Sequence, residues 1–334
     1  MGELFAGRYE FVDLLGDGGM GTVWRVWDHR DQGYRAAKVL KQSDSVSLLR
    51  FVRETSWRID HEHVVTPLGW SAEDDRVLFT MPLVGGGTVA TLLSDFGRLP
   101  PLWVHELLGQ LLTALEAVHA TGLVHRDVKP GNLLLDPTGT GRPHLRLTDF
   151  GIAAPVGDPR LTRAGESIGT PGYQAPEAAH GADPDPRQDL YAAGVVALEL
   201  LTGRRPPISN SSRPDTSPIA GLIFAPVIER LVEPDPARRY SSATQARAAL
   251  AAVRPPSSDR TAAGDIEVFG QLPELPDHWD ESGPTPRSPA ADAHTAEQQV
   301  IEAPADRSGR LPVWAGGLIA VGLVFIVIAA LLVR

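Results

Sequence analysis

The chain has 334 residues, more than one average domain, and a formal net charge of −10. This charge argues against a nucleic-acid partner, because proteins that bind phosphate backbones present positive surfaces. The chain contains no cysteine, so the sequence excludes a disulfide framework and a thiolate metal site.

Lysine is rare in this chain, with three lysines against 28 arginines. Two of the three, Lys38 and Lys129, stand inside short motifs. Lysine carries a compact, strongly hydrated ammonium group, whereas the broad guanidinium group of arginine fits a phosphate site differently. The retained lysines therefore indicate two positions where a point charge meets a phosphate oxygen.

The first motif is glycine-rich, and residues 16–21 read Gly-Asp-Gly-Gly-Met-Gly. Glycine lets a turn between two strands close over a triphosphate without Cβ clashes. A similar spacing occurs in dinucleotide-binding turns, but there the motif opens a helix. Residues 22–27 read Thr-Val-Trp-Arg-Val-Trp, and such branched and aromatic residues predict a β-strand.

A second strand is predicted at residues 35–40, which include Lys38, and the stretch that carries Glu54 is predicted to be helical. A lysine and a glutamate placed in this way form the ion pair that orients the α- and β-phosphates of ATP. We therefore predict that Lys38 pairs with Glu54.

Two histidines, His61 and His63, have a spacing that resembles a metal-binding pair. Alternate residues of a strand would place their rings on opposite faces, and no third ligand follows at a suitable spacing. We therefore expect the ordinary structural role for them and no zinc site.

The central motif follows a core helix predicted at residues 102–120, and residues 125–132 read His-Arg-Asp-Val-Lys-Pro-Gly-Asn. Asp127 can accept the proton of a substrate hydroxyl, and Asn132 can offer an oxygen ligand to Mg²⁺. Residues 149–151 then read Asp-Phe-Gly, and the Asp149 carboxylate is expected to bind the Mg²⁺ that bridges the phosphates. Residues 175–177, Ala-Pro-Glu, close the intervening segment at the distance expected of an activation loop.

These motifs, in this order, resemble those of the bacterial eukaryotic-like (Hanks-type) transmembrane serine/threonine protein kinases over residues 9–252. The resemblance implies an α+β fold of the bilobal kinase type, with a small β-rich N-lobe (residues 9–80) and a mainly helical C-lobe. Residues 190–201 are expected to be a second core helix. Lys129 is the residue that serine/threonine-specific members carry at this place, and residues 169–173, Gly-Thr-Pro-Gly-Tyr, fit the same class.

The resemblance also implies site residues. Catalytic roles are implied for Asp127, Lys129, Lys38 and Glu54, and metal binding for Asn132 and Asp149. The implied nucleotide site comprises Leu15, Gly16, Asp17, Gly18, Gly19, Met20, Gly21, Val23, Ala36, Lys38, Thr80, Met81, Leu83 and Leu134, with Thr80 as gatekeeper and Met81–Leu83 as hinge. Structural roles are implied for Arg126, Phe150, Gly151, Glu177, Asp189 and Arg239, with Asp189 bracing the catalytic loop and Glu177 pairing with Arg239.

The implied cofactors are ATP and Mg²⁺, with Mn²⁺ as a substitute, and the implied partners are protein substrates and a transient homodimer. Three hydroxyl groups, those of Thr162, Ser167 and Thr170, are phosphorylation candidates in the activation loop. We predict trans-autophosphorylation on Thr162, whose phosphate would bind Arg126. Ser167 is the second candidate, and Thr170 is expected to hydrogen-bond Asp127 and Lys129 instead. The alternative is that Thr162 and Ser167 are ordinary loop hydroxyls.

The C-terminal part has two further segments. Residues 253–312 are rich in Pro, Ala and Ser, and residues 254–312 hold 11 acidic residues against 5 arginines, so we predict a disordered acidic juxtamembrane linker. Residues 313–333 carry no charge and would span about 32 Å as a helix, enough for a bilayer. Arg307 and Arg310 just before this span predict a single-pass cell-membrane protein whose kinase domain faces the cytoplasm.

Two questions stay open at this level. Residues 203–235 are short and rich in proline, where members of the resembled family have a longer region with a helix that helps to dock substrates. The alternative function is a membrane-tethered pseudokinase or scaffold. The presence of Lys38, Asp127 and Asp149 favours an active enzyme.

Overall fold

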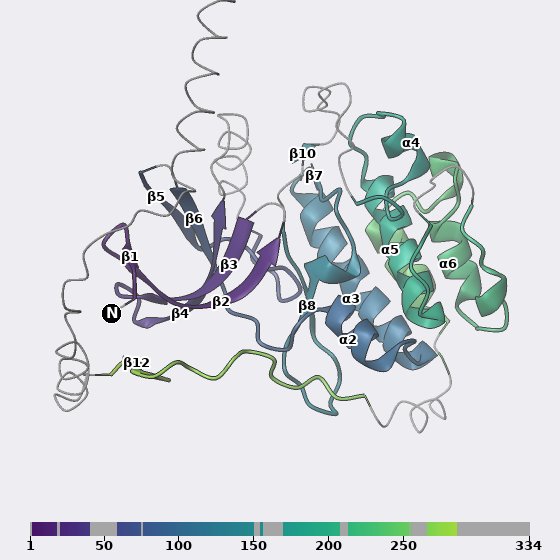
Figure 1. Ribbon diagram of the computed structural model, residues 1–334. Coiled ribbons are helices and arrows are strands. Elements are labelled where there is room, and N and C mark those ends of the chain that lie inside the picture. The colour runs from purple at the N-terminus through teal and green to yellow at the C-terminus, as the bar shows by residue number, and fades with distance from the viewer. Residues whose placement is uncertain are drawn as a thin grey trace, which may run out of the picture. The chain divides into compact units, whose positions relative to one another are not determined.

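A computed structural model describes residues 2–18, 21–40, 59–74, 76–149, 154–155, 170–207, 213–253, 255 and 266–285. These residues belong to one compact unit, residues 1–285, in which a strand-rich lobe lies beside a mainly helical lobe (Figure 1). Several predictions fall outside the described residues, namely those for Gly19, Met20, Glu54, Phe150, Gly151, Thr162, Ser167 and the membrane span 313–333. Within the described ranges, no helix is long and apolar enough to cross a bilayer.

The N-lobe is built on a six-stranded antiparallel sheet with the order β1-β2-β3-β4-β6-β5. Its strands are β1 (Leu4–Phe5), β2 (Tyr9–Gly18), β3 (Gly21–Asp28), β4 (Gly33–Leu40), β5 (Gly69–Glu73) and β6 (Arg76–Met81). The hairpin of β2 and β3 closes at Gly18 and Gly21, so the glycine-rich motif is a strand-turn-strand unit as predicted. The core of the lobe comprises Phe5, Tyr9, Val26, Ala37, Val39 and Leu78.

The C-lobe is built around two long helices, α3 (Pro101–Ala120) and α5 (Pro186–Thr202), which contain the helices predicted at 102–120 and 190–201. Asp185 begins α5 by accepting a hydrogen bond from the backbone N–H of Arg187, and Gly203 ends it in the left-handed conformation. The other helices are α2 (Val89–Phe96), η1 (Pro130–Asn132), α4 (Pro176–Ala179), η3 (Ser217–Ile219), α6 (Ala225–Leu231), η4 (Pro236–Arg238) and α7 (Ala243–Ala251).

Two short antiparallel strand pairs of the C-lobe flank the predicted motifs. One joins β7 (Leu123–Val124) to β10 (Ala154–Pro155), and the other is the hairpin of β8 (Leu133–Leu135) and β9 (Leu145–Leu147). Leu133 pairs with Leu147, and the backbone N–H of Thr148 donates to the carbonyl oxygen of Asn132 at 3.0 Å. The register of β8 and β9 therefore brings Asn132 and Asp149 to the same end of the hairpin.

The structure of the C-terminal tail contradicts part of the prediction that residues 253–312 form a disordered linker. Residues 266–285 are ordered against both lobes, and they contain β11 (Trp279–Asp280) and β12 (Gly283–Pro284). Ile266 and Val268 are buried in the C-lobe core. The prediction was wrong for these residues because the apolar surface that orders them belongs to the two lobes, which the composition of the tail does not reveal.

The proline-rich segment 203–235 contains helices. Within its described residues it forms η3 and α6, and the apolar face of α6 is buried through Ala225, Val227, Ile228 and Leu231.

Candidate active site

The centre of the candidate site is the carboxylate of Asp127, which is only 6% exposed. The Lys129 ammonium donates to Oδ2 at 2.7 Å, and the Thr170 hydroxyl donates to Oδ1 at 2.7 Å. Lys129 also donates to the Thr170 hydroxyl at 2.9 Å, and the Asn132 amide nitrogen donates to Oδ2 of Asp127 at 2.9 Å. A carboxylate, an ammonium group and a hydroxyl group thus meet in one hydrogen-bonded cluster.

The protonation state of Asp127 follows from these contacts. Burial raises its pKa, but the hydrogen bonds from Lys129 and Thr170 and the Lys129 charge outweigh burial and hold the pKa below its usual range. The carboxylate is therefore ionised at neutral pH and can accept a proton from a hydroxyl group.

The backbone of the catalytic motif is held by Asp189, a fully buried residue of α5. Its two carboxylate oxygens accept hydrogen bonds from the backbone N–H groups of His125 and Arg126, both at 2.8 Å. Burial raises the pKa of Asp189, but its hydrogen bond with His119 Nε2 and the neighbouring histidines bring the pKa below its usual range. His119 at the end of α3 was not predicted, because it lies outside the recognisable motifs.

A second polar contact joins the lobes across the site. The Lys38 ammonium on β4 donates to Oδ1 of Asp149, which follows β9, at 2.7 Å. The predicted partner of Lys38 was Glu54, which lies outside the described residues. The structure therefore brings together the predicted phosphate-binding lysine and the predicted metal-binding aspartate.

The strand register of the N-lobe shows which of the predicted nucleotide-binding residues share a face of the sheet. Lys38 pairs with Val23 on β3, and Ala36 pairs with Met81 on β6. Partners on neighbouring strands and alternate residues along one strand share a face. Val23, Ala36, Lys38 and Met81 therefore point to the same side of the sheet.

Thr80 does not lie on this side, which makes its prediction as gatekeeper wrong. It pairs with the fully buried Ala37 on the opposite face, and its hydroxyl donates to the carbonyl oxygen of Gly69 at 3.4 Å. The predicted hinge began one residue too early for the same reason, since Met81 is the last residue of β6 and faces the site. Pro82 has no N–H, so Leu83 is the first residue after the strand that can donate to a nucleotide.

The residues predicted to bind a metal ion suit Mg²⁺ in their chemistry. The amide nitrogen of Asn132 is engaged with the backbone and side-chain oxygens of Asp127, at 2.8 and 2.9 Å. The amide oxygen of Asn132 is therefore the atom that could bind a metal ion. The β8–β9 hairpin brings Asp149 to the end that carries Asn132. Mg²⁺ prefers such carboxylate and carbonyl oxygens.

A comparison with protein families decides the class. Residues 9–248 match the family model described as the protein kinase domain. The chain belongs to the protein kinase family. The kinase is 37% identical over 270 residues to the serine/threonine-protein kinase PkaA of Streptomyces coelicolor, and this match covers 72% of the kinase and 49% of PkaA.

Further relatives support the serine/threonine class. The kinase is 33% identical to the serine/threonine-protein kinase PknA of Mycobacterium tuberculosis, over the whole chain and 82% of PknA. It is 41% identical over 244 residues to the DNA damage-responsive serine/threonine-protein kinase RqkA of Deinococcus radiodurans, which covers 70% of the kinase and 34% of RqkA. The kinase thus spans about half of PkaA and most of PknA, and the family and these relatives make it a serine/threonine protein kinase.

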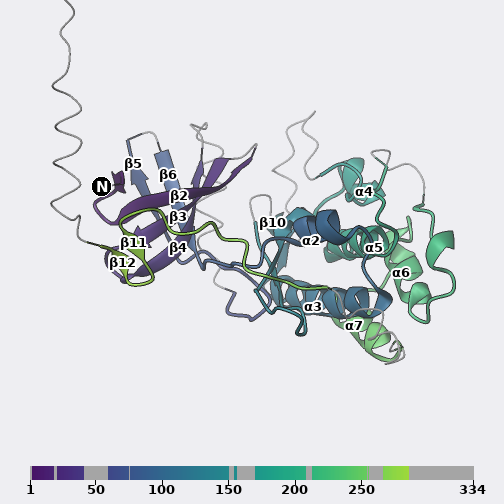
Figure 2. The same cartoon turned by 60° about the horizontal axis from the view of Figure 1, so that its bottom comes forward.

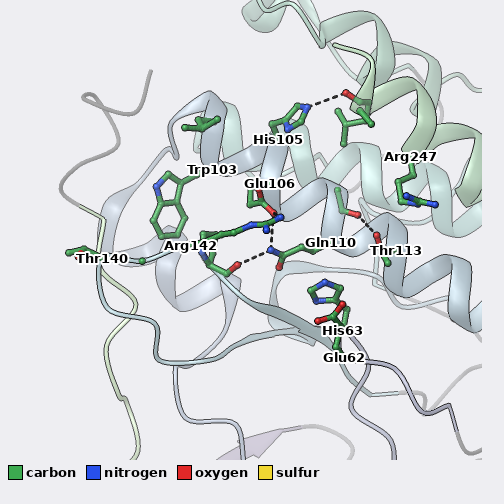
Figure 3. Close-up of a pocket in the computed structure, with 16 residues that line it drawn as sticks. Glu62, His63, Trp103, His105, Glu106, Gln110, Thr113, Thr140, Arg142 and Arg247 are labelled. Carbon is green, nitrogen blue, oxygen red and sulfur yellow. Dashed lines mark hydrogen bonds and ion pairs between the residues drawn. The ribbon is translucent and has the colours of Figure 1, made fainter. Parts of the chain in front are cut away.

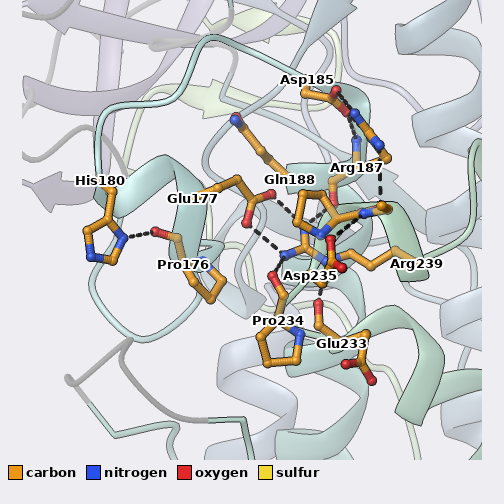
Figure 4. A network of polar contacts seen from close by, with 12 residues as sticks. Pro176, Glu177, His180, Asp185, Arg187, Gln188, Glu233, Pro234, Asp235 and Arg239 are labelled. Atoms are coloured by element: carbon orange, nitrogen blue, oxygen red, sulfur yellow. Dashed lines mark hydrogen bonds and ion pairs between the residues drawn. The ribbon is translucent and has the colours of Figure 1, made fainter.

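The end of the activation segment is anchored in the kinase by Arg239 (Figure 4). Its guanidinium group forms a bidentate pair with Glu177, at 2.6 and 2.7 Å, and also donates to the backbone oxygens of Glu233, Pro234 and Arg187. The same group lies 4.9 Å from the ring centre of Tyr191. Since its other donors are bound to backbone oxygens, this buried charge fixes Glu177 in place.

The kinase also has a cavity of about 810 Å³ away from these groups, beside α3 and α7 (Figure 3). Three of its charged side chains have partners: Glu106 accepts hydrogen bonds from Gln110 at 3.0 Å and from Arg142 at 2.5 Å, and Arg247 donates to Glu116 at 2.8 Å. Among the described residues that line it, none is predicted to bind ATP, metal or substrate.

The two histidines near this cavity differ from expectation in their arrangement. Residues 61–63 form a turn rather than a strand, so the rings of His61 and His63 lie 5.7 Å apart. His63 Nδ1 lies 2.7 Å from the carbonyl oxygen of Leu145, and burial lowers the pKa of His63. Within the described residues, no group of three or more His, Asp or Glu side chains is arranged to hold a metal ion.

Proposed function

We propose that this kinase transfers the γ-phosphoryl group of ATP to serine and threonine hydroxyls of proteins. The observation that carries the proposal is the Asp127 cluster, in which an ionised carboxylate lies 2.7 Å from the Lys129 ammonium and accepts a hydrogen bond from a threonine hydroxyl. A substrate hydroxyl needs the same two neighbours, one to accept its proton and one to offset negative charge.

Asp127 is the proposed base. The substrate oxygen forms a bond to the γ-phosphorus, the bond from this phosphorus to the bridging oxygen of ADP breaks, and the hydroxyl proton passes to the carboxylate. Lys129 offsets the negative charge of the phosphoryl oxygens during transfer. Asp189 supports this step indirectly, because its hydrogen bonds fix the backbone N–H groups of the two residues directly before the base.

Lys38, Asn132 and Asp149 are the proposed phosphate and metal residues. When bound, Mg²⁺ supplies positive charge between the phosphate oxygens. Asp149 and the amide oxygen of Asn132 would hold this ion. Lys38 would orient the α- and β-phosphates, paired with Glu54 as the sequence predicts.

The proposed regulation is trans-autophosphorylation of the activation loop in a transient homodimer. Thr162 stands between Arg160 and Arg163 in the sequence, and a phosphate on it would add a charge of about −2 that Arg126 can bind. The hydroxyl of Thr170 is already engaged by Asp127 and Lys129, which supports Thr162 and Ser167 over Thr170 as the switch.

The proposed location is the cell membrane, with the kinase domain in the cytoplasm. The support is the uncharged stretch 313–333 and the arginines that precede it, Arg307 and Arg310.

Labelled ATP tests the proposed reaction. The purified full chain with Mg²⁺ and a generic protein substrate should produce phosphoserine and phosphothreonine but no phosphotyrosine, and a chelator should abolish the transfer. A chain that binds ATP but transfers no phosphate with Mg²⁺ or Mn²⁺, even after activation-loop phosphorylation, would favour the scaffold alternative.

A further inference from the structure

The ordered part of the tail, residues 266–285, which we name the interlobe strap, begins in the C-lobe. Val268 is 1% exposed and belongs to the C-lobe core. It exchanges two backbone hydrogen bonds with Gly139, both at 2.9 Å. The next residue, Phe269, is 49% exposed, so Val268 and the buried Ile266 form the anchor.

The strap then contacts the chain directly after the hinge. The backbone N–H of Gln271 donates to the carbonyl oxygen of Gly85 at 2.7 Å. Gly87 has a φ of +74°, and a Cβ atom there would lie 2.1 Å from Oε1 of Gln271. The Gln271 side chain thus lies against Gly87, whose left-handed backbone favours glycine.

The next contact is made by Arg25, a buried residue on β3. Its guanidinium group pairs with Asp13 on β2, at 2.6 and 2.7 Å, and also donates to the carbonyl oxygens of Pro273 and Glu274, at 2.9 and 3.3 Å. One side chain therefore links the strap to both strands of the hairpin that carries the glycine-rich turn.

The strap ends on the N-lobe sheet, where β11 and β12 lie beside β3 and β4 (Figure 2). The Tyr34 hydroxyl on β4 donates to the carbonyl oxygen of Asp280 at 2.5 Å, and the Tyr34 ring lies 6.2 Å from the ring of Trp279. Gly283 packs so closely on Trp27 that a Cβ atom there would lie 2.6 Å from the indole ring.

We propose that the interlobe strap positions the hinge and the glycine-rich hairpin for ATP, and that the backbone N–H at position 271, not the Gln271 side chain, makes its contact beside the hinge. Three observations carry this proposal: an anchor in the C-lobe core, a backbone hydrogen bond beside the hinge, and contacts to β3 and β4, which hold Val23 and Lys38. A segment fixed on both lobes limits how far they can separate. The proposal rests on the ATP-binding role proposed above.

The kinetic test uses the full chain and two matched pairs of variants. Gln271→Pro removes the backbone N–H that donates to the carbonyl oxygen of Gly85, whereas Gln271→Ala keeps this N–H. Val268→Asp places a charge at the buried anchor, whereas Phe269→Asp changes its exposed neighbour. We expect Gln271→Pro and Val268→Asp to raise the KM for ATP by about tenfold, with kcat changed less, and the controls to match the wild type.

A distance measurement tests the strap without relying on catalysis. The chain has no cysteine, so spin labels attach only at the introduced Arg30→Cys and Glu281→Cys, both exposed positions. The distance between the two labels reports where the strap lies relative to the N-lobe. A narrow distance distribution that broadens with Val268→Asp is expected. A broad distribution without the substitution would overturn the proposal, and so would an unchanged KM for ATP in Gln271→Pro.

The two proposals fail in different ways. If the wild type binds a fluorescent ATP analogue and transfers no phosphate, the proposed reaction fails; the strap is then tested by the affinity for this analogue, which Gln271→Pro should weaken about tenfold. If Gln271→Pro binds the analogue as tightly as Gln271→Ala does, the proposed role of the strap is wrong.

Discussion

Arg238 and Arg239 are neighbours in the sequence, but their side chains lie in opposite environments. The Arg238 side chain is 70% exposed and lies 3.3 Å from Glu233, whereas the Arg239 side chain is fully buried and pairs with Glu177. An exposed ion pair contributes little to stability, whereas removal of one partner from a buried pair leaves an uncompensated charge.

This contrast predicts different costs for the two alanine substitutions. Arg239→Ala should lower the free energy of unfolding by about 3–5 kcal/mol, because the Glu177 carboxylate loses its bidentate partner. Arg238→Ala should lower it by less than about 1 kcal/mol. Denaturant unfolding of both variants measures the difference, and equal costs would contradict the assigned burial.

The pair of Tyr173 and Glu199 predicts a pH-dependent stability. Burial raises the pKa of Glu199, although the Tyr173 hydroxyl donates to it at 2.5 Å. Because the pKa of Glu199 is raised in the folded state, protonated Glu199 contributes to stability. This contribution is fully present below the unfolded pKa of about 4.3 and is lost as the pH rises through the folded pKa. Glu199→Gln should therefore stabilise the protein at neutral pH, with a gain that shrinks as the pH falls. Unfolding curves from pH 8 to pH 5 test this, and a gain that grows toward acid would contradict it.

Autophosphorylation predicts a defined pattern of sites. Mass spectrometry of the chain expressed alone should find phosphate on Thr162, with Ser167 as the second site, and the Asp127→Asn variant should carry none. Phosphate absent from both residues, with full activity in a Thr162→Ala/Ser167→Ala variant, would refute the proposed switch.

The membrane proposal predicts the effect of a deletion. Removal of residues 313–334 should move the protein from the membrane fraction to the soluble fraction while phosphoryl transfer continues, since the described active site lies entirely within residues 1–285. A truncated protein that stays with the membrane would require another anchor.

The proposed catalytic centre could be predicted from the sequence because its chemistry restricts the residue types. Only a carboxylate suits the role of Asp127, and the spacing to Lys129 and Asn132 brings all three into contact on one loop. The gatekeeper was missed by one residue. Side chains in a strand alternate between faces, so an error of one position exchanges Met81 for Thr80 and reverses the side of the sheet.

The strap was missed for a different reason. Its residues are mostly polar or proline, and Ile266 and Val268 become buried only against the C-lobe. Local composition reports whether a segment can form a core of its own, but not whether it can complete the core of a neighbouring domain. The contacts of Arg25 with Pro273 and Glu274 join residues about 250 positions apart, which no local pattern reveals.

The most direct test of the account compares the rate of phosphoryl transfer with the affinity for ATP in Asp127→Asn. The account predicts that the rate falls by about 10²–10⁴-fold, because the base is lost, while ATP affinity and melting temperature stay close to those of the wild type. Asp31→Asn, which changes an exposed carboxylate on the N-lobe, serves as the control and should retain full activity. An Asp127→Asn variant that transfers phosphate at the wild-type rate would contradict the assignment of Asp127 as the catalytic base.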